Sequence, residues 1–213
     1  MENTNLALSL MTNGYIILDN KLSSTDICLI SEQIKQERLK SPNTSLTYNT
    51  SSWKWPEKAR PAFLNNISLH LPVLERIFNG EPTYIRSWLR VVHPNEYGVK
   101  WHQDHDILIA PVPIIVGFFL DSVTADNGAT MLVPYSQWLP HPSYDRMEYS
   151  RKISLVGEQG TVVLFLASVW HCSGRNMTNS SRSIFFVEFG AKNSFRVSMS
   201  PEEYQANTCH IID

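Results

Sequence analysis

The stretch Gly160–Asn176, GTVVLFLASVWHCSGRN, is a strongly apolar run that ends in a histidine, His171, followed by a Ser-Gly turn. β-Branched and aromatic residues bounded by glycine are typical of a buried β-strand. A strand of this kind places its terminal polar side chain at the mouth of a barrel or sandwich. We therefore expect the imidazole of His171 to face a cavity.

Short runs of the same kind recur through the rest of the chain. Turn sequences such as HPNEYG, ADNG and GEQG separate them. Several short strands with irregular loops favour a barrel or sandwich, so residues 83–199 are expected to form a mainly β core. The runs are YIRSWLRVV (84–92), VPIIVGFFL (112–120), ATMLVP (129–134) and RSIFFVEFG (182–190).

The N-terminal part, residues 1–82, has a different residue pattern, with helix signals, and is expected to form helices that support the core. GYIILD (14–19) has the pattern of a short strand, and the Ser/Thr/Asp cluster that follows can cap a helix. The isoleucines at 27, 30 and 34 then recur at helical spacing. In LPVLERIFNG (71–80), Pro72 suits a first helical turn and Gly80 a C-terminal cap.

Between these helices lies a polar stretch, residues 41–61, that carries Tyr48, Trp53 and Trp55. A loop with aromatic side chains suits a substrate lid, and simple packing of the loop explains the same residues equally well. Residues 1–213 are expected to form one domain, because 213 residues leave little room for a second full core.

Composition excludes several classes of function. The formal net charge of −2 and the lack of a Lys/Arg cluster argue against nucleic acid or an anionic membrane as a partner. No apolar run approaches the ~20 residues of a membrane span, and no leader is evident. Three widely separated cysteines favour a reducing, cytoplasmic location without a disulfide framework. The oligomeric state cannot be read from the sequence.

The stretch VKWHQDHDILIAP (99–111) contains two histidines and two aspartates within five residues. On an extended strand, side chains at i and i+2 share a face, so His102 and Asp104 are expected to point the same way. An imidazole and a carboxylate are two ligands of the facial triad that holds non-haem Fe(II). His171 can supply the third ligand from another strand.

Arg182 stands eleven residues after His171, at the start of a predicted strand. If the two strands are adjacent, its planar guanidinium can bind a carboxylate through two hydrogen bonds. Ser173 could add a hydroxyl to the same carboxylate. An oxo acid that binds iron at one end and has a distal carboxylate would need such a cation.

These motifs together resemble the phytanoyl-CoA dioxygenase family of Fe(II)/2-oxoglutarate oxygenases. The resemblance rests on WHQD, DNGATMLVPYSQW, GTVVLFLASVWHCSGRN and the downstream Arg182, and it covers residues 101–190 well. It implies a double-stranded β-helix, the jelly-roll fold. It also implies His102, Asp104 and His171 as iron ligands and Arg182 and Ser173 as contacts of 2-oxoglutarate.

The same resemblance implies a reaction that uses Fe(II), 2-oxoglutarate and dioxygen and releases succinate and carbon dioxide. Hydroxylation of a small molecule, such as an amino acid or a biosynthetic intermediate, is the default outcome. Desaturation or cyclisation at the same iron site stays open, as does a non-catalytic jelly-roll binding module. A halogenase is disfavoured, because halogenases of the family have a small residue where Asp104 stands.

The neighbouring polar and aromatic residues are given structural roles. His105 is out of phase with the ligand pair and is expected to face outward or toward the rim, and Asp106 is treated as a rim residue. A buried arginine needs an anionic partner, so we expect Arg86 or Arg90 to contact substrate or co-substrate, without deciding which. Packing roles are expected for Cys172, Trp101 and Trp170.

Overall fold

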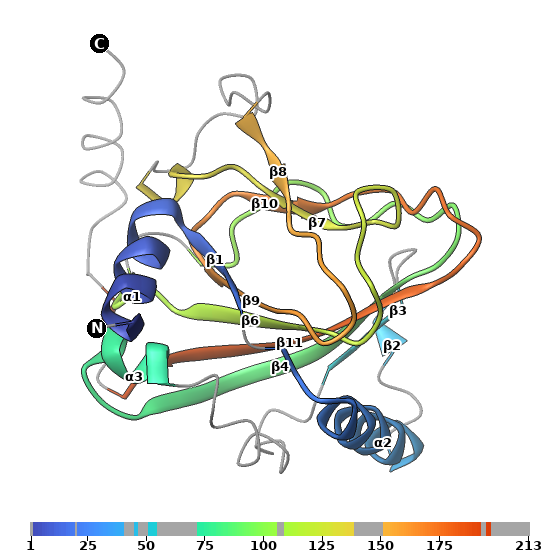
Figure 1. The fold of residues 1–213 in the computed structure, drawn as a ribbon, viewed down its shortest axis with the longest axis horizontal. Helices are drawn as coiled ribbons and strands as arrows, with labels where there is room; N and C mark the ends of the chain where they lie inside the picture. Colours follow the sequence, from blue (N-terminus) through green and yellow to red (C-terminus); the bar gives the residue numbers. More distant parts are fainter. Residues whose placement is uncertain are drawn as a thin grey trace.

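The computed structural model describes residues 2–19, 21–40, 45–46, 51–54, 72–105, 109–138, 151–192 and 195–196 of the chain. Two antiparallel sheets face each other, with helices at one end and along the outer side of the larger sheet (Figure 1). The described helices are α1 (Glu2–Asn13), α2 (Ser24–Lys40), α3 (Pro72–Phe78) and the 3-10 helix η3 (Ser136–Trp138).

The larger sheet has seven strands in the order β1-β9-β6-β11-β4-β3-β2. Neighbouring strands in this sheet are antiparallel. The order brings β9, which carries the apolar run of the distal histidine, two places away from β11, which begins at Arg182. The strands are β1 (Tyr15–Leu18), β2 (Ser45–Leu46), β3 (Ser51–Lys54), β4 (Pro82–Val92), β6 (Ile114–Phe119), β9 (Val162–Leu166) and β11 (Arg182–Ala191).

A three-stranded sheet, β10-β7-β8, lies opposite the larger one (Figure 1). A two-stranded sheet pairs β12 with β5. This mainly β architecture confirms the expected double-stranded β-helix. The remaining strands are β5 (Ile109–Ala110), β7 (Thr130–Leu132), β8 (Ile153–Ser154), β10 (His171–Ser173) and β12 (Phe195–Arg196).

The central strands β6 and β9 are buried along their whole length. Along β9, Val162, Leu164 and Leu166 pack in the cluster that includes the helices, whereas Val163 and Phe165 pack in a second cluster on the other face. Both faces of the sheet are therefore covered. This explains why the sequence of these strands is continuously apolar rather than alternating.

The N-terminal part supplies three strands as well as helices. β1 pairs with β9, and β2 and β3 extend the sheet beyond β4. The predicted helix at 24–40 is confirmed, with Ile30 and Ile34 buried, and the predicted helix at 72–78 does begin at Pro72. α1 was not expected. Its apolar residues pack beside α3, at the left of Figure 1.

The C-terminal end of α3 differs in one detail from the prediction. The left-handed residue after α3 is Asn79, with φ 51°, rather than Gly80. The Gly80 N–H still closes the helix by donating to Glu75 O at 3.1 Å, and Asn79 is a residue type that tolerates the left-handed conformation.

Of the aromatic residues in the polar stretch 41–61, Trp53 lies in β3, opposite Leu89. The expectations for Tyr48 and Trp55 fall outside the described residues.

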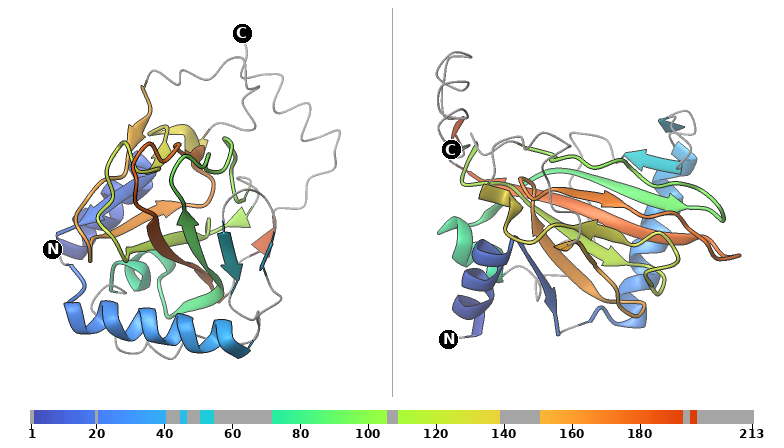
Figure 2. Two further views of the ribbon diagram at one scale, coloured as in Figure 1. Left: turned by 90° about the vertical axis from the view of Figure 1, so that its right-hand side faces the viewer. Right: turned by 90° about the horizontal axis from the view of Figure 1, so that it is seen from above.

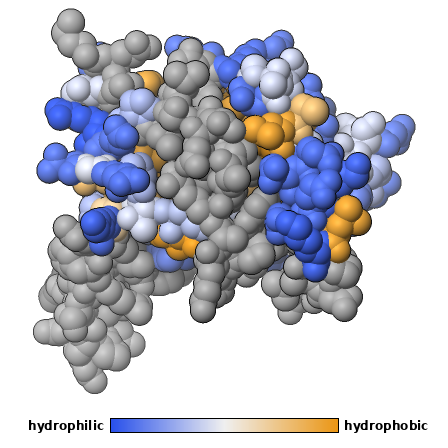
Figure 3. All heavy atoms as spheres, turned by 90° about the horizontal axis from the view of Figure 1, so that it is seen from below, coloured by the Kyte–Doolittle hydropathy of each residue, from blue (hydrophilic) through white to orange (hydrophobic). Residues whose placement is uncertain are grey.

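α2 lies along the outer side of the larger sheet (Figure 2). Seen from below, the coloured residues are mostly hydrophilic and the hydrophobic ones form separate patches (Figure 3). The most exposed large apolar side chains, which include Leu8, Leu39, Tyr97 and Met177, belong to different parts of the chain. Single exposed apolar residues of this kind are ordinary on a protein surface. None of the described helices is long and apolar enough to cross a membrane.

Candidate active site

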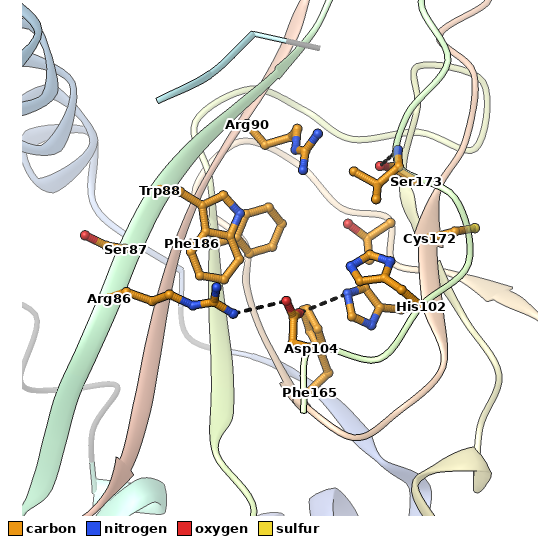
Figure 4. A pocket seen from close by; sticks show the side chains of 13 residues that line it. Arg86, Ser87, Trp88, Arg90, His102, Asp104, Phe165, Cys172, Ser173 and Phe186 are labelled. Atoms are coloured by element: carbon orange, nitrogen blue, oxygen red, sulfur yellow. Dashed lines mark hydrogen bonds and ion pairs between the residues drawn. The ribbon is translucent and has the colours of Figure 1, made fainter. Parts of the chain in front are cut away.

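Three side chains that the sequence singled out converge between the two sheets. An isolated β-bridge joins His102 to His171: each backbone N–H donates to the other residue's carbonyl, at 2.9 and 3.0 Å. The two imidazole ring centroids are 4.3 Å apart, and Asp104 Oδ2 lies 3.2 Å from His171 Nε2. One donor atom from each of the three side chains lies within 4.8 Å of the others. Figure 4 shows His102 and Asp104 side by side at the cavity.

Asp104 reaches this position through a bend rather than through a strand. His102 forms only the isolated bridge, and the chain bends at Asp104 and His105. The N–H groups of both bent residues donate to Ala167 O, at 2.9 and 3.1 Å. The predicted convergence of His102 and Asp104 is therefore present, but its expected cause, the alternation of side chains along a strand, is wrong.

The hydrogen bonds of both imidazoles leave the same ring nitrogen for a ligand. His102 Nδ1 lies 2.7 Å from Lys100 O, and His171 Nδ1 lies 3.0 Å from Val169 O. A carbonyl oxygen only accepts, so Nδ1 of each ring carries the proton. In the neutral form of each ring, Nε2 then carries the lone pair that a metal needs, which is the usual arrangement of metal-binding histidines.

The electrostatics of the three side chains suit a divalent cation. Burial by itself raises the pKa of Asp104, but the hydrogen bond and charge of His171, with the charges of His102 and Arg86, hold that pKa well below its usual range. Burial, followed by the neighbouring His171, lowers the pKa of His102. An ionised carboxylate and a neutral imidazole are the protonation states that bind metal.

The three residues fit the iron that the sequence implies. Two imidazole nitrogens and one carboxylate on one side of an open space form the facial arrangement used for non-haem Fe(II). They adjoin a cavity of about 270 Å³. Its other lining residues include two arginines, three aromatic residues and two serines: Arg86, Arg90, Trp88, Phe165, Phe186, Ser87 and Ser173 (Figure 4).

Arg182 lies at the start of β11, almost fully buried at 1% exposure. It is not one of the residues that line the cavity. Its Nε is 3.5 Å from Asn127 O, whereas Nη1 and Nη2 have no hydrogen-bond partner among the described residues. Burial and the neighbouring charge of Arg90 lower the pKa of Arg182 to about 10. Two orphaned donors in a buried cation fit a carboxylate ligand.

Gly128 lies beside this guanidinium in a conformation that favours glycine. Its backbone is left-handed, with φ +84°, and a Cβ at this position would lie 3.5 Å from Arg182 Nη2 and 3.1 Å from Val92 Cγ1. A side chain here would therefore be strained and would crowd Val92 and the Gly174 carbonyl oxygen, which lies 3.2 Å away.

The sequence of the chain matches the family model of phytanoyl-CoA dioxygenase (PhyH) over residues 12–184. The chain belongs to the PhyH family. Together with the donor set, membership confirms the iron and 2-oxoglutarate expected from the sequence. Which side chains hold them stays a prediction. A search of curated protein sequences returns no match.

Solved structures of similar fold cover nearly the whole PhyH chain. AviO1 from Streptomyces viridochromogenes Tue57 shares 18% identity, with a TM-score of 0.69 over 92% of this chain and 98% of that one. The non-heme alpha ketoglutarate dependent carbocyclase SnoK from nogalamycin biosynthesis shares 14% identity, with a TM-score of 0.72 over 95% of this chain and 90% of that one. EctD from S. alaskensis, solved with 2-oxoglutarate and 5-hydroxyectoine, shares 18% identity, with a TM-score of 0.70 over 88% of this chain and 75% of that one. At these identities, the likeness shows the fold.

Sequence reasoning about this PhyH chain missed a buried charged group, Glu188 on β11, which is 0% exposed. Arg86 Nε donates to Glu188 Oε2, and Arg86 Nη2 donates to Asp104 Oδ1 at 3.1 Å. Alternation along RSIFFVEFG was a usable signal, because it places Glu188 on the same face as Phe186. The sequence did not show which residue pairs with it.

His105, which was expected to face outward or toward the rim, turns toward β11. Its side chain is 27% exposed, and Nε2 lies 2.5 Å from Glu188 Oε1. The bend at Asp104 and His105 breaks the assumed alternation, so the ring turns toward β11. Hydrogen bonding to Glu188 raises the pKa of His105 despite the opposing effect of burial. Asp106 lies outside the described residues.

The packing roles expected for three aromatic and sulfur side chains are confirmed. Trp101 packs against buried Trp170 and Val133. Cys172 is 5% exposed, and burial raises the pKa of its thiol to about 12. Figure 4 shows the thiol pointing away from the cavity.

Proposed function

We propose that the protein is an Fe(II)- and 2-oxoglutarate-dependent dioxygenase that hydroxylates a small molecule and releases succinate and carbon dioxide. The observation that carries this proposal is the convergence of His102, Asp104 and His171, with both histidines fixed through Nδ1 so that Nε2 is the nitrogen available to a metal. Membership of the PhyH family supports the same chemistry.

In this proposal the three side chains bind iron from one side and leave its other positions for ligands. When bound, iron and 2-oxoglutarate supply oxidation by dioxygen coupled to decarboxylation of the oxo acid. Arg182 binds the distal carboxylate of 2-oxoglutarate through Nη1 and Nη2, the two donors that lack a described partner.

Ser173 is proposed as a second contact for that carboxylate. Its hydroxyl oxygen accepts a hydrogen bond from Val99 N–H at 2.9 Å, so the hydroxyl proton is available for donation into the cavity that Ser173 lines. Gly98 makes this contact possible, because a Cβ there would overlap Ser173 and lie 2.5 Å from its carbonyl oxygen.

The small volume of the cavity supports a small substrate or a small reacting part of one. Trp88 and Phe186 stack with ring centroids 5.3 Å apart, and Phe165 meets Phe186 edge-on at 6.3 Å. These rings give one wall an apolar surface that excludes water from the reacting groups. Asp104 keeps the carboxylate that a halogenase of the family would lack.

Anaerobic titration with Fe(II) and 2-oxoglutarate tests the iron site directly. The wild-type protein should develop the visible charge-transfer band of an iron-bound oxo acid, and His102→Ala and Asp104→Ala should not. Arg175→Gln, on the exposed surface, is a matched control that should keep the band. A wild-type protein without the band would instead support a non-catalytic binding module.

A second experiment identifies the reaction. Amino acids and other small molecules are screened for stimulated succinate release, and the products are analysed by mass spectrometry. Hydroxylation adds one oxygen atom to the substrate, whereas desaturation or cyclisation removes two hydrogen atoms. A product of the second kind would refute hydroxylation and retain the iron site.

A further inference from the structure

A buried charged network lies behind the carboxylate of Asp104. Its centre is Glu188, fully buried on β11 between β4 and β6. A carboxylate in such a place requires compensation by hydrogen bonds and opposite charge. Glu188 has both: Arg86 Nε donates to Oε2, and the His105 ring lies 2.5 Å from Oε1.

Arg86 connects this buried carboxylate to the candidate metal site. It stands directly opposite Glu188 in the β4–β11 register, and its guanidinium lies 5.1 Å from the ring centroid of Trp88. With Nε committed to Glu188, Nη2 reaches Asp104 Oδ1 at 3.1 Å (Figure 4). The guanidinium is therefore fixed on one side by a buried carboxylate and on another by an aromatic ring.

The two oxygens of Asp104 consequently have different surroundings. Oδ1 accepts the hydrogen bond of Arg86, whereas Oδ2 faces His171 Nε2 at 3.2 Å. The oxygen that lies next to His171 is the one that Arg86 does not contact.

We propose that Arg86, held by Glu188, is a positioning residue that presents only Oδ2 of Asp104 to the metal. This inference rests on the proposed iron site. If both oxygens of Asp104 bound the metal, the carboxylate would take a position that the co-substrate or dioxygen needs. Arg86 prevents this by occupying Oδ1, and it compensates part of the carboxylate's charge.

A purely structural role for Arg86 would require fewer contacts than it makes. An ion pair between Arg86 and Glu188 across two strands would by itself compensate the buried carboxylate. The contact with Asp104 goes further, because Asp104 lies in the bend after His102 and outside the sheet. It commits a second donor of the guanidinium to a candidate metal ligand.

The test measures metal binding rather than turnover. Metal-free wild-type, Arg86→Gln and Glu188→Gln proteins are titrated with Co(II) against a competing chelator, and the visible spectrum of the Co(II) protein is recorded. Loss of a residue that orients a metal ligand typically weakens metal affinity by roughly 10- to 100-fold. We expect a loss in this range for Arg86→Gln, with a changed spectrum because the coordination by Asp104 changes.

Two further variants separate positioning from folding. Arg86→Gln leaves Glu188 with one partner fewer, so the double variant Arg86→Gln/Glu188→Gln removes both charges together and protects the fold. If Glu188 acts only through Arg86, the double variant should bind Co(II) as weakly as Arg86→Gln alone. Arg175→Gln, an exposed arginine outside the network, should bind like the wild type.

The outcomes distinguish this inference from the proposed function. Wild-type affinity and spectrum in a folded Arg86→Gln protein, or in the double variant, would overturn the positioning role while leaving the iron site intact. If the double variant loses as much Co(II) affinity as the product of the losses in the two single variants, Glu188 acts independently of Arg86, and the part assigned to Glu188 is overturned. A wild-type protein that binds no Co(II) or Fe(II) would overturn the proposed function together with this inference.

Discussion

The buried guanidinium of Arg182 should make the metal-free protein less stable and its complex with 2-oxoglutarate tighter. Burial and Arg90 lower the pKa of Arg182 from 12.5 to about 10. Each tenfold change in proton affinity corresponds to about 1.36 kcal/mol, so the buried charge costs the folded protein about 3 kcal/mol. This cost is complete at neutral pH, where the guanidinium is charged in both the folded and the unfolded state. It is relieved only above pH about 10, as the folded protein releases the proton.

The substitution Arg182→Met tests both halves of this reasoning. Methionine fills a similar volume without a charge, and replacing buried ions by apolar residues often stabilises a protein by about 1–4 kcal/mol. Urea unfolding of the metal-free variant should therefore show a free energy of unfolding up to about 3 kcal/mol above that of the wild type.

The same variant should bind 2-oxoglutarate poorly. Removing one partner of a buried, hydrogen-bonded charge pair costs about 2–5 kcal/mol, which raises the dissociation constant by roughly 30-fold to several thousand-fold. Calorimetric titration of 2-oxoglutarate into the anaerobic Fe(II) protein measures this constant. Arg182→Lys, which keeps the charge but loses the planar fork, should lie between the two.

Two results would refute the reasoning for Arg182. Unchanged 2-oxoglutarate affinity in Arg182→Met would show that the guanidinium does not bind the co-substrate. A metal-free Arg182→Met protein with a lower free energy of unfolding than the wild type would show that the charge of the guanidinium is already compensated within the fold, without a bound carboxylate.

Two further predictions concern single positions around the cavity. Gly98→Ala should lower the free energy of unfolding by about 1–3 kcal/mol, because the added methyl overlaps Ser173; Gly80→Ala, with no atom within 4 Å of the added Cβ, is the control in urea unfolding. At pH 8, Cys172 should be alkylated at least 100-fold more slowly than exposed Cys28, because burial raises its pKa to about 12 and its thiolate is scarce. Peptide mapping after a short iodoacetamide pulse measures both rates, and equal labelling would contradict the burial of Cys172.

The sequence was sufficient to predict the fold class and the three candidate ligands. The apolar run before His171 predicted a buried strand, which the structure confirms as β9 and joins to His102 through an isolated bridge. The local path of the chain was not predictable in the same way. Asp104 and His105 both donate to Ala167 O, and a contact with another part of the chain sets this bend. Alternation along the local sequence does not encode such a contact.

The network around Glu188 was missed for a related reason. Its contacts join residues 18, 83 and 102 positions apart in the chain. RSIFFVEFG shows that position 188 carries an acid within an apolar strand, and a buried acid requires a partner. Nothing in the local pattern shows which of the basic residues upstream lies opposite, because that depends on the pairing of β11 with β4.

The register of these two strands is what separates the roles of Arg86 and Arg90. Both lie on the cavity face of β4, as their spacing by four residues along a strand requires. The register places Glu188 opposite Arg86 and Ile184 opposite Arg90. A shift by four residues would bring the carboxylate to Arg90 and take it away from Arg86, without any change in which face of β4 the two arginines occupy. Alternation therefore selects the face of each strand, whereas register decides which cation supports Asp104.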